Sequence, residues 1–152
     1  MADRPLMIGV GSPLRHDDGV GRAVAQMIRE ASPRARVIEM EGEGAALLEA
    51  WTGAGLVVIV DAVRSGAAPG TVFRFEPSSD PLPATLSSTS THAFGLPAAV
   101  ELARTLGQLP RRLVVFGIEG LDFTAGEGLS TAVRTAVGTV AARVRAELEQ
   151  GT

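Results

Sequence analysis

Apolar residues in this 152-residue chain fall into two spacings that alternate along the sequence. Nearly unbroken apolar runs cover residues 6–10, 56–60 and 113–118, and a weaker run covers 37–40. Such runs are typical of strands in a parallel sheet with both faces covered. Residues 71–75 instead alternate between apolar and polar and closely follow a Pro-Gly turn, so we expect them to pair antiparallel or to lie near an edge.

Between the runs, apolar residues recur at the spacing of one helical face. The pattern predicts a helix from Gly19 onward, with Asp17 or Asp18 as its N-cap, a short helix over 45–51, a helix from Pro97 to a stop at Gly107, and a long helix over 129–148. Residues 77–93 and 119–128 are predicted loops. We therefore expect one α/β domain over residues 1–152, a three-layer α/β/α sandwich on a five-stranded, mostly parallel sheet with one antiparallel strand.

The composition removes several kinds of chemistry. All 14 basic residues are Arg, and the chain has no Lys, Cys, Tyr or Asn. A lysine Schiff base, a phosphate-loop lysine, a thiol nucleophile and a disulfide are therefore excluded. Any metal ligand must be a carboxylate or one of the two histidines, His16 and His92.

Charge and hydropathy also limit the partners. The formal net charge is −3 and no run of basic residues occurs, so neither nucleic acid nor an anionic membrane is an expected partner. No apolar stretch is long enough for a signal-peptide core or a membrane span. We expect a soluble, cytoplasmic protein that acts as a monomer.

Polar residues that follow the predicted strands are the candidates for function, because ligands of open α/β sheets gather at the carboxyl ends of the strands. These candidates are Asp17, Asp18, Asp61, His92 and Glu119. Each has a simpler interpretation: Asp18 could only cap a helix, His92 could be an ordinary loop histidine, and Glu119 could only accept hydrogen bonds from a neighbouring loop. Asp61 directly follows five apolar residues, so it must be paired or reach solvent in a cleft.

Two carboxylates and one imidazole from three loops match the ligand set of a divalent ion with an open position, such as zinc or nickel. Two other sites are excluded. The glycines after the first strand do not complete a dinucleotide fingerprint, because Leu14 stands where the third Gly is required. No G-x-S-x-G esterase motif occurs.

Three segments carry a resemblance that spans most of the chain. They are Gly9-Val-Gly-Ser-Pro-Leu-Arg-His-Asp-Asp-Gly-Val-Gly21, Val60-Asp-Ala-Val63 and Thr91-His-Ala-Phe-Gly-Leu96. In this order they closely resemble the hydrogenase maturation endopeptidases. The resemblance implies an α/β/α endopeptidase that removes a C-terminal extension from the large-subunit precursor of a nickel-iron hydrogenase, after nickel insertion. It also implies that Asp18, Asp61 and His92 are the metal-contacting and catalytic residues.

Two schemes fit this resemblance. In the first, the three residues grip nickel that the substrate already holds, and the metal positions the scissile bond. In the second, a bound ion such as zinc, or a carboxylate, activates water and polarises the carbonyl. We favour the first scheme for recognition, with Asp17 as a candidate general base. Ser12, where the family often has Asn, and the Gly42-Glu-Gly44 turn depart from the family pattern, which leaves the substrate open. A non-proteolytic metal-dependent binding protein or chaperone and a small-molecule metallohydrolase are the alternatives.

Overall fold

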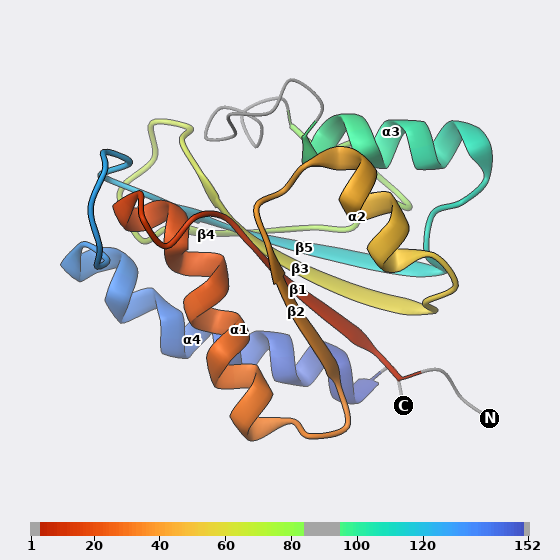
Figure 1. Ribbon diagram of the computed structural model, residues 1–152, viewed down its shortest axis with the longest axis horizontal. Coiled ribbons are helices and arrows are strands. Elements are labelled where there is room, and N and C mark those ends of the chain that lie inside the picture. The colour runs from red at the N-terminus through yellow and green to blue at the C-terminus, as the bar shows by residue number, and fades with distance from the viewer. Residues whose placement is uncertain (1–3, 84–94, 151–152) are drawn as a thin grey trace.

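The computed structural model describes residues 4–83 and 95–150. Its sheet has the strand order β2-β1-β3-β5-β4, as Figure 1 shows. The strands are β1 (Leu6–Val10), β2 (Arg36–Met40), β3 (Leu56–Val63), β4 (Val72–Phe75) and β5 (Arg112–Glu119). All pairs are parallel except β4 with β5. The predicted fold class, five strands with one antiparallel, is therefore confirmed.

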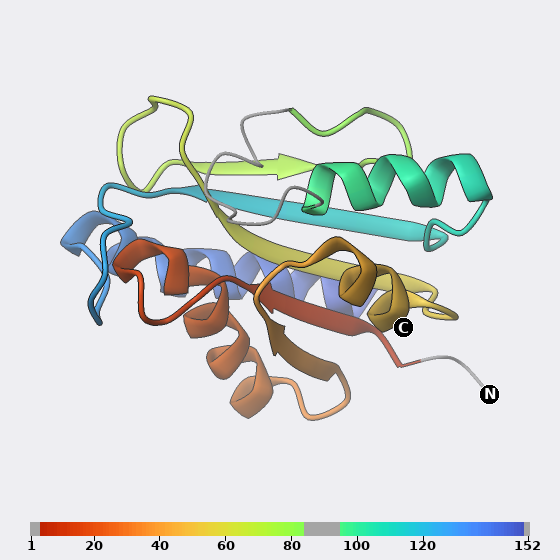
Figure 2. The same cartoon turned by 45° about the horizontal axis from the view of Figure 1, so that its top comes forward.

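Helices cover both faces of the sheet. The helices are α1 (Val20–Ala31), α2 (Gly44–Trp51), α3 (Leu96–Leu106) and α4 (Thr131–Gln150), and a 3₁₀ turn η1 (His16–Gly19) precedes α1. α1 packs beside α4 on one face and α2 beside α3 on the other (Figure 2). Side chains of each strand alternate between the two apolar layers: Val58 and Val60 lie in the α1/α4 layer, whereas Val57 and Ile59 lie in the α2/α3 layer.

Two differences from the sequence prediction bear on the site. β3 does not end at Asp61 but continues to Val63, because β5 supplies backbone partners as far as the pair Val63 and Glu119. A charged residue ended the apolar run, yet the ladder of backbone hydrogen bonds does not depend on side-chain polarity. The predicted N-cap is also wrong: Gly19 is the N-cap of α1 without a side-chain hydrogen bond, and Asp17 and Asp18 lie in η1.

Close contact between α1 and the sheet sets the position of η1. A Cβ atom on Gly21 would overlap the carbonyl oxygen of Val60 and would lie 2.5 Å from the carbonyl oxygen of Val10. Only glycine allows the first turn of α1 to lie this near β1 and β3. The turn that precedes α1 is thereby held at the carboxyl ends of these two strands, which is where the candidate acids were predicted.

Within the described ranges, no helix has the length and apolar character needed to cross a membrane.

Candidate functional site

Two of the three predicted site residues come together at the carboxyl edge of the sheet. Asp18 belongs to η1 and Asp61 to β3, and both are almost fully buried, with 7% and 6% of their surface exposed. η1 contacts β3, and burial first and then the negative charge of Asp18 raise the pKa of Asp61. The sequence prediction that these acids share one edge is therefore correct in position.

Asp18 is held by the loop that follows β1. Its Oδ2 atom accepts a hydrogen bond of 2.9 Å from the backbone N–H of Ser12. Burial raises the pKa of Asp18, while the Ser12 amide and the positive charges of Arg15 and Arg22 oppose that rise. Arg22 also donates from Nε to the carbonyl oxygen of Gly11 at 2.5 Å, so the cation bonds to the backbone beside the acid.

Asp61 has fewer partners. Among the described residues, the one hydrogen bond to its carboxylate comes from the N–H of the next residue, Ala62, at 2.8 Å. Burial first, and then the charge of Asp18, raise the pKa of Asp61 well above its usual value. Because strand residues alternate, Asp61 shares its face with Val57 and Ile59 and therefore points toward the layer that α2 and α3 cover.

His92, the third predicted ligand, lies outside the described residues. It precedes the first residue of α3, Leu96, by four positions, and Leu96 packs in the same apolar layer as Val57 and Ile59. Residues 4–83 and 95–150 contain no group of three His, Cys, Asp or Glu that could hold a metal ion. The three-ligand metal site thus stays a prediction.

Asp17 faces away from the pair. It is fully buried, and its carboxylate accepts hydrogen bonds from the backbone N–H groups of Leu121, Asp122 and Ser130 and from the Ser130 hydroxyl, at 2.7–3.0 Å. Burial by itself would raise the pKa of Asp17, but these hydrogen bonds together lower it. Both oxygens are occupied and the lowered pKa makes a weaker base, which argues against Asp17 as the general base.

Glu119 and His16 also contact loops rather than the acid pair. Glu119 accepts hydrogen bonds from the N–H groups of Ser65 and Gly66 and from the Ser65 hydroxyl, so its simpler interpretation as a loop acceptor is confirmed. His16 has a φ of 42° and its Nδ1 lies 3.0 Å from the carbonyl oxygen of Gly128. It is therefore tied to the loop that follows β5.

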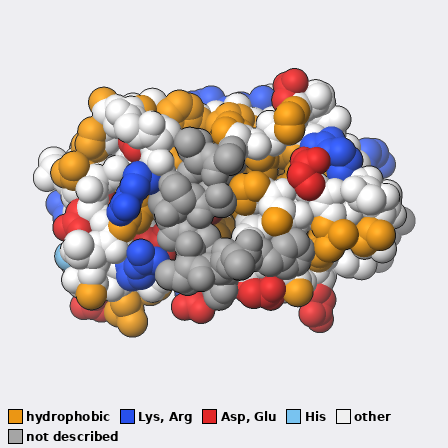
Figure 3. Space-filling model, turned by 90° about the horizontal axis from the view of Figure 1, so that it is seen from above, with side chains coloured by type: hydrophobic (Ala, Val, Ile, Leu, Met, Phe, Trp, Pro, Cys, Tyr) orange, Lys and Arg blue, Asp and Glu red, His pale blue; other side chains and the backbone are white. Residues whose placement is uncertain are grey.

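The sequence reasoning missed the contribution of the loop over residues 120–130. Besides binding Asp17, this loop carries Phe123, whose ring lies 4.5 Å from the guanidinium carbon of Arg64 just after β3. The stacked pair borders the carboxyl end of β3. No spacing in the sequence indicates it, because Arg64 and Phe123 come from separate loops. Figure 3 views the α2/α3 face, where basic side chains are visible at both ends.

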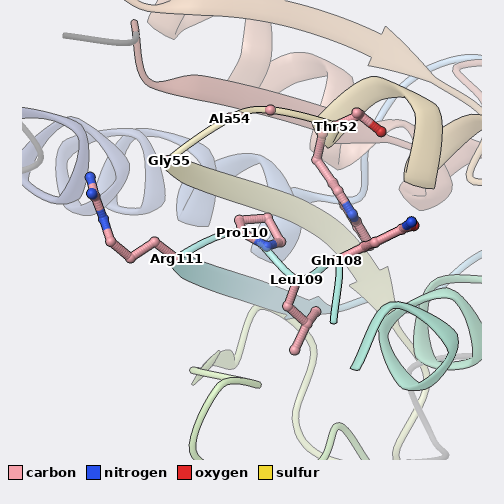
Figure 4. Close-up of a pocket in the computed structure, with 9 residues that line it drawn as sticks. Thr52, Ala54, Gly55, Gln108, Leu109, Pro110 and Arg111 are labelled. Atoms are coloured by element: carbon pink, nitrogen blue, oxygen red, sulfur yellow. The ribbon is translucent and has the colours of Figure 1, made fainter. Parts of the chain in front are cut away.

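A pocket of about 370 Å³ lies at the opposite edge of the sheet. Its lining residues precede β3 and β5, and Figure 4 shows them around the amino ends of these strands: Thr52, Ala54, Gly55, Gln108, Leu109, Pro110 and Arg111. Because the acids lie at the carboxyl ends, this pocket is separate from the candidate site.

Comparison with known proteins identifies the family. A family model described as hydrogenase maturation protease matches residues 21–147. The chain belongs to the hydrogenase maturation protease family. The match includes β3 with Asp61 and begins just after η1, so the resemblance noted from the sequence motifs is confirmed.

Individual relatives and one solved structure agree with this family assignment and with the fold. The hydrogenase expression/formation protein HupD of Thiocapsa roseopersicina is 31% identical over 120 residues, which cover 77% of this chain and 54% of HupD. The chain thus spans about half the length of that curated relative. The hydrogenase maturating endopeptidase HybD of Escherichia coli matches with a TM-score of 0.75 at 22% identity, over 97% of this chain and 93% of HybD.

A second solved structure, an endopeptidase from Escherichia coli, matches with a TM-score of 0.78 at 23% identity, over 97% of this chain and 93% of that protein. At these identities the structural matches establish the fold of the hydrogenase maturation proteases for this chain.

Proposed function

We propose that this protein is an endopeptidase that removes the C-terminal extension of a nickel-iron hydrogenase large-subunit precursor after nickel insertion, acting as a monomer in the cytoplasm. Family membership supports the reaction class and the partner, since the matched family is that of the hydrogenase maturation proteases. The HupD relative is itself named as a hydrogenase expression/formation protein.

The observation that carries the proposal is the buried pair Asp18 and Asp61. Two carboxylates that repel each other in a poorly hydrated place destabilise the chain unless a proton or a cation is shared between them. Within residues 4–83 and 95–150, Asp61 receives no ion pair. A divalent cation brought by a partner would relieve this repulsion and would gain two oxygen ligands.

His92 would supply the third ligand. Four peptide units between His92 and Leu96 extend at most about 14 Å, and Leu96 packs in the apolar layer toward which Asp61 points. Position 92 is thus joined by a short stretch of chain to the layer that Asp61 faces, which supports His92 as the third ligand. Two carboxylates and an imidazole are suitable ligands for nickel or zinc. Because no thiolate is among them, they are better suited to fill the open positions of an ion already anchored in the substrate than to bind an ion alone.

In the proposed mechanism, the substrate's nickel is a recognition handle. Asp18, Asp61 and His92 bind it and thereby hold the large subunit so that the scissile peptide bond lies at the carboxyl edge of the sheet. Hydrolysis adds a water oxygen to the carbonyl carbon, breaks the C–N bond and transfers a proton to the leaving amine. The raised pKa of Asp61 belongs to the pair before nickel binds, because a bound cation favours the ionised carboxylate.

The test uses purified large-subunit precursor, with and without nickel, and mass spectrometry of its C-terminus after incubation with this protein. We expect cleavage of the nickel-loaded form alone. Asp61→Asn should lose this cleavage, whereas Asp80→Asn, which changes an exposed carboxylate, should keep it. Equal cleavage of both precursor forms would favour a protease that carries its own ion, such as zinc. Stable binding without cleavage would favour the non-proteolytic binding protein or chaperone.

A further inference from the structure

Asp17 joins η1 to a loop that lies 104 to 113 residues further along the chain. Its Oδ1 atom accepts from the backbone N–H of Ser130 at 2.7 Å. Its Oδ2 atom accepts from the N–H groups of Leu121 and Asp122 and from the Ser130 hydroxyl, at 2.8, 3.0 and 2.8 Å. One buried carboxylate therefore binds the loop over residues 120–130 at both of its ends.

The far end of this loop is the start of α4. Ser130 immediately precedes Thr131, the first residue of α4, and its carbonyl accepts the helical hydrogen bond from Arg134. A negative charge at this end of the helix is favoured by the helix dipole and by N–H groups that lack helical partners. α4 is anchored in turn by fully buried residues such as Val133, Val140 and Val144. The hydrogen bonds from Ser130 therefore connect Asp17 to a helix that is fixed in the apolar core.

Backbone hydrogen bonds strengthen the same junction. The N–H of Asp17 donates to the carbonyl of Asp122, the N–H of His16 donates to the carbonyl of Gly126, and the N–H of Gly126 donates to the carbonyl of Leu14, each at 2.9 Å. Residues 14–17 are therefore fastened to the 120–130 loop on one side. On the other side, the hydrogen bond to the Asp18 carboxylate among the described residues comes from Ser12.

We propose that Asp17 is a positioning residue: its carboxylate fixes η1 between the 120–130 loop and the start of α4, and this holds Asp18 beside Asp61. What Asp18 then does rests on the proposed function, but its placement does not. Asparagine at position 17 would have the right shape but one accepting oxygen. Its NH₂ group would face the donors that now reach the second oxygen, so η1 would move away from the loop.

The experiment compares Asp17→Asn with a matched control at the other end of α4. Glu147 is also a buried carboxylate and accepts from Arg74 at 2.6 Å and from Arg112 at 2.8 Å. Glu147→Gln therefore removes the charge and one of the two accepting oxygens of a comparable buried carboxylate, at a position away from η1. Both variants are studied below their unfolding temperatures, where circular dichroism shows them folded, so that activity is expressed per folded molecule.

The first readout needs no substrate. The amide of Ser12 reports the position of Asp18, because it donates to the Asp18 carboxylate. In Asp17→Asn we expect the hydrogen-exchange protection of the Ser12 amide to fall about tenfold, and the amides of Leu121, Asp122 and Ser130 to lose protection as well. In Glu147→Gln these amides should keep their protection. Loss of protection at the loop amides with unchanged Ser12 exchange would show that Asp17 only caps α4 and would overturn the proposal.

The second readout is cleavage of nickel-loaded precursor. A misplaced Asp18 should lower kcat about 10- to 100-fold in Asp17→Asn with a smaller change in KM, and Glu147→Gln should match the wild type. Wild-type activity in Asp17→Asn would refute the positioning role. If the wild type does not cleave the precursor, the proposed function fails, and the Ser12 exchange alone then decides whether Asp17 positions Asp18.

Discussion

Replacing Gly21 with Ala should destabilise the protein, although alanine is the better helix former. The added Cβ would lie 2.8 Å from the backbone nitrogen of Val10 and 2.5 Å from its carbonyl oxygen, and would overlap the carbonyl oxygen of Val60. Ordinary contacts need about 3.5 Å, so the start of α1 would have to retreat by roughly 1 Å. The neighbours are backbone atoms of two central strands, which cannot rotate aside as a side chain could.

The magnitude follows from two opposing effects. Overpacking a well-packed region costs about 1–3 kcal/mol, and contacts with rigid backbone put this site at the upper end. Higher helix propensity returns about 1 kcal/mol. The expected net loss in the free energy of unfolding is therefore about 2 kcal/mol. Because α1 carries η1 at its start, the same retreat should displace Asp18 and reduce cleavage of the precursor.

Urea denaturation followed by circular dichroism measures this loss, and Gly138→Ala provides the matched control. Gly138 lies on the exposed face of α4, and a Cβ there would meet nothing within 4 Å. That variant should gain about 0.5–1 kcal/mol. If Gly21→Ala were as stable as Gly138→Ala, the close approach of α1 to the sheet would be refuted.

Three further predictions concern the acids and the histidine. Asp61→Asn should abolish cleavage yet raise the free energy of unfolding at pH 7. The pKa of Asp61 is higher in the folded chain than its ordinary value of 3.8, so the wild type loses stability as the pH rises above 3.8. Urea titrations should therefore give the two proteins the same free energy of unfolding near pH 3. Binding of nickel-loaded precursor should weaken below about pH 6, because the His92 imidazole must be neutral to bind a metal, and equal calorimetric affinities at pH 5.5 and 7.5 would remove His92 from the site. Glu147→Gln should lower the free energy of unfolding by about 1–2 kcal/mol, because Arg74 and Arg112 lose a largely buried partner. The loss is limited because both arginines are partly exposed to water. Unchanged thermal unfolding would show that the two ion pairs contribute nothing to stability.

Hydrophobic periodicity was sufficient to predict the order of strands and helices and the layered fold. Both faces of β1, β3 and β5 are buried, so these strands are apolar over most of their length, and each helix must present one apolar stripe to the sheet. The alternating β4 is less buried and lies at the edge, as its pattern indicated. Ends of elements were less predictable, because backbone pairing with β5 carries β3 past the charged Asp61.

The sequence by itself determined the fold class and the candidate acids. The spacing of apolar residues and the polar residues that follow apolar runs can both be recognised from neighbouring residues alone. The motif resemblance assigned the site role to Asp18, but only the tertiary structure gave the physical difference between Asp17 and Asp18. The two are adjacent and chemically identical, so neither periodicity nor propensity separates them. They differ in their partners: Asp18 accepts from Ser12, six residues away, whereas Asp17 accepts from Ser130, 113 residues away. Such contacts form only when α4 packs on the sheet, which is why folding decides which carboxylate lies beside Asp61.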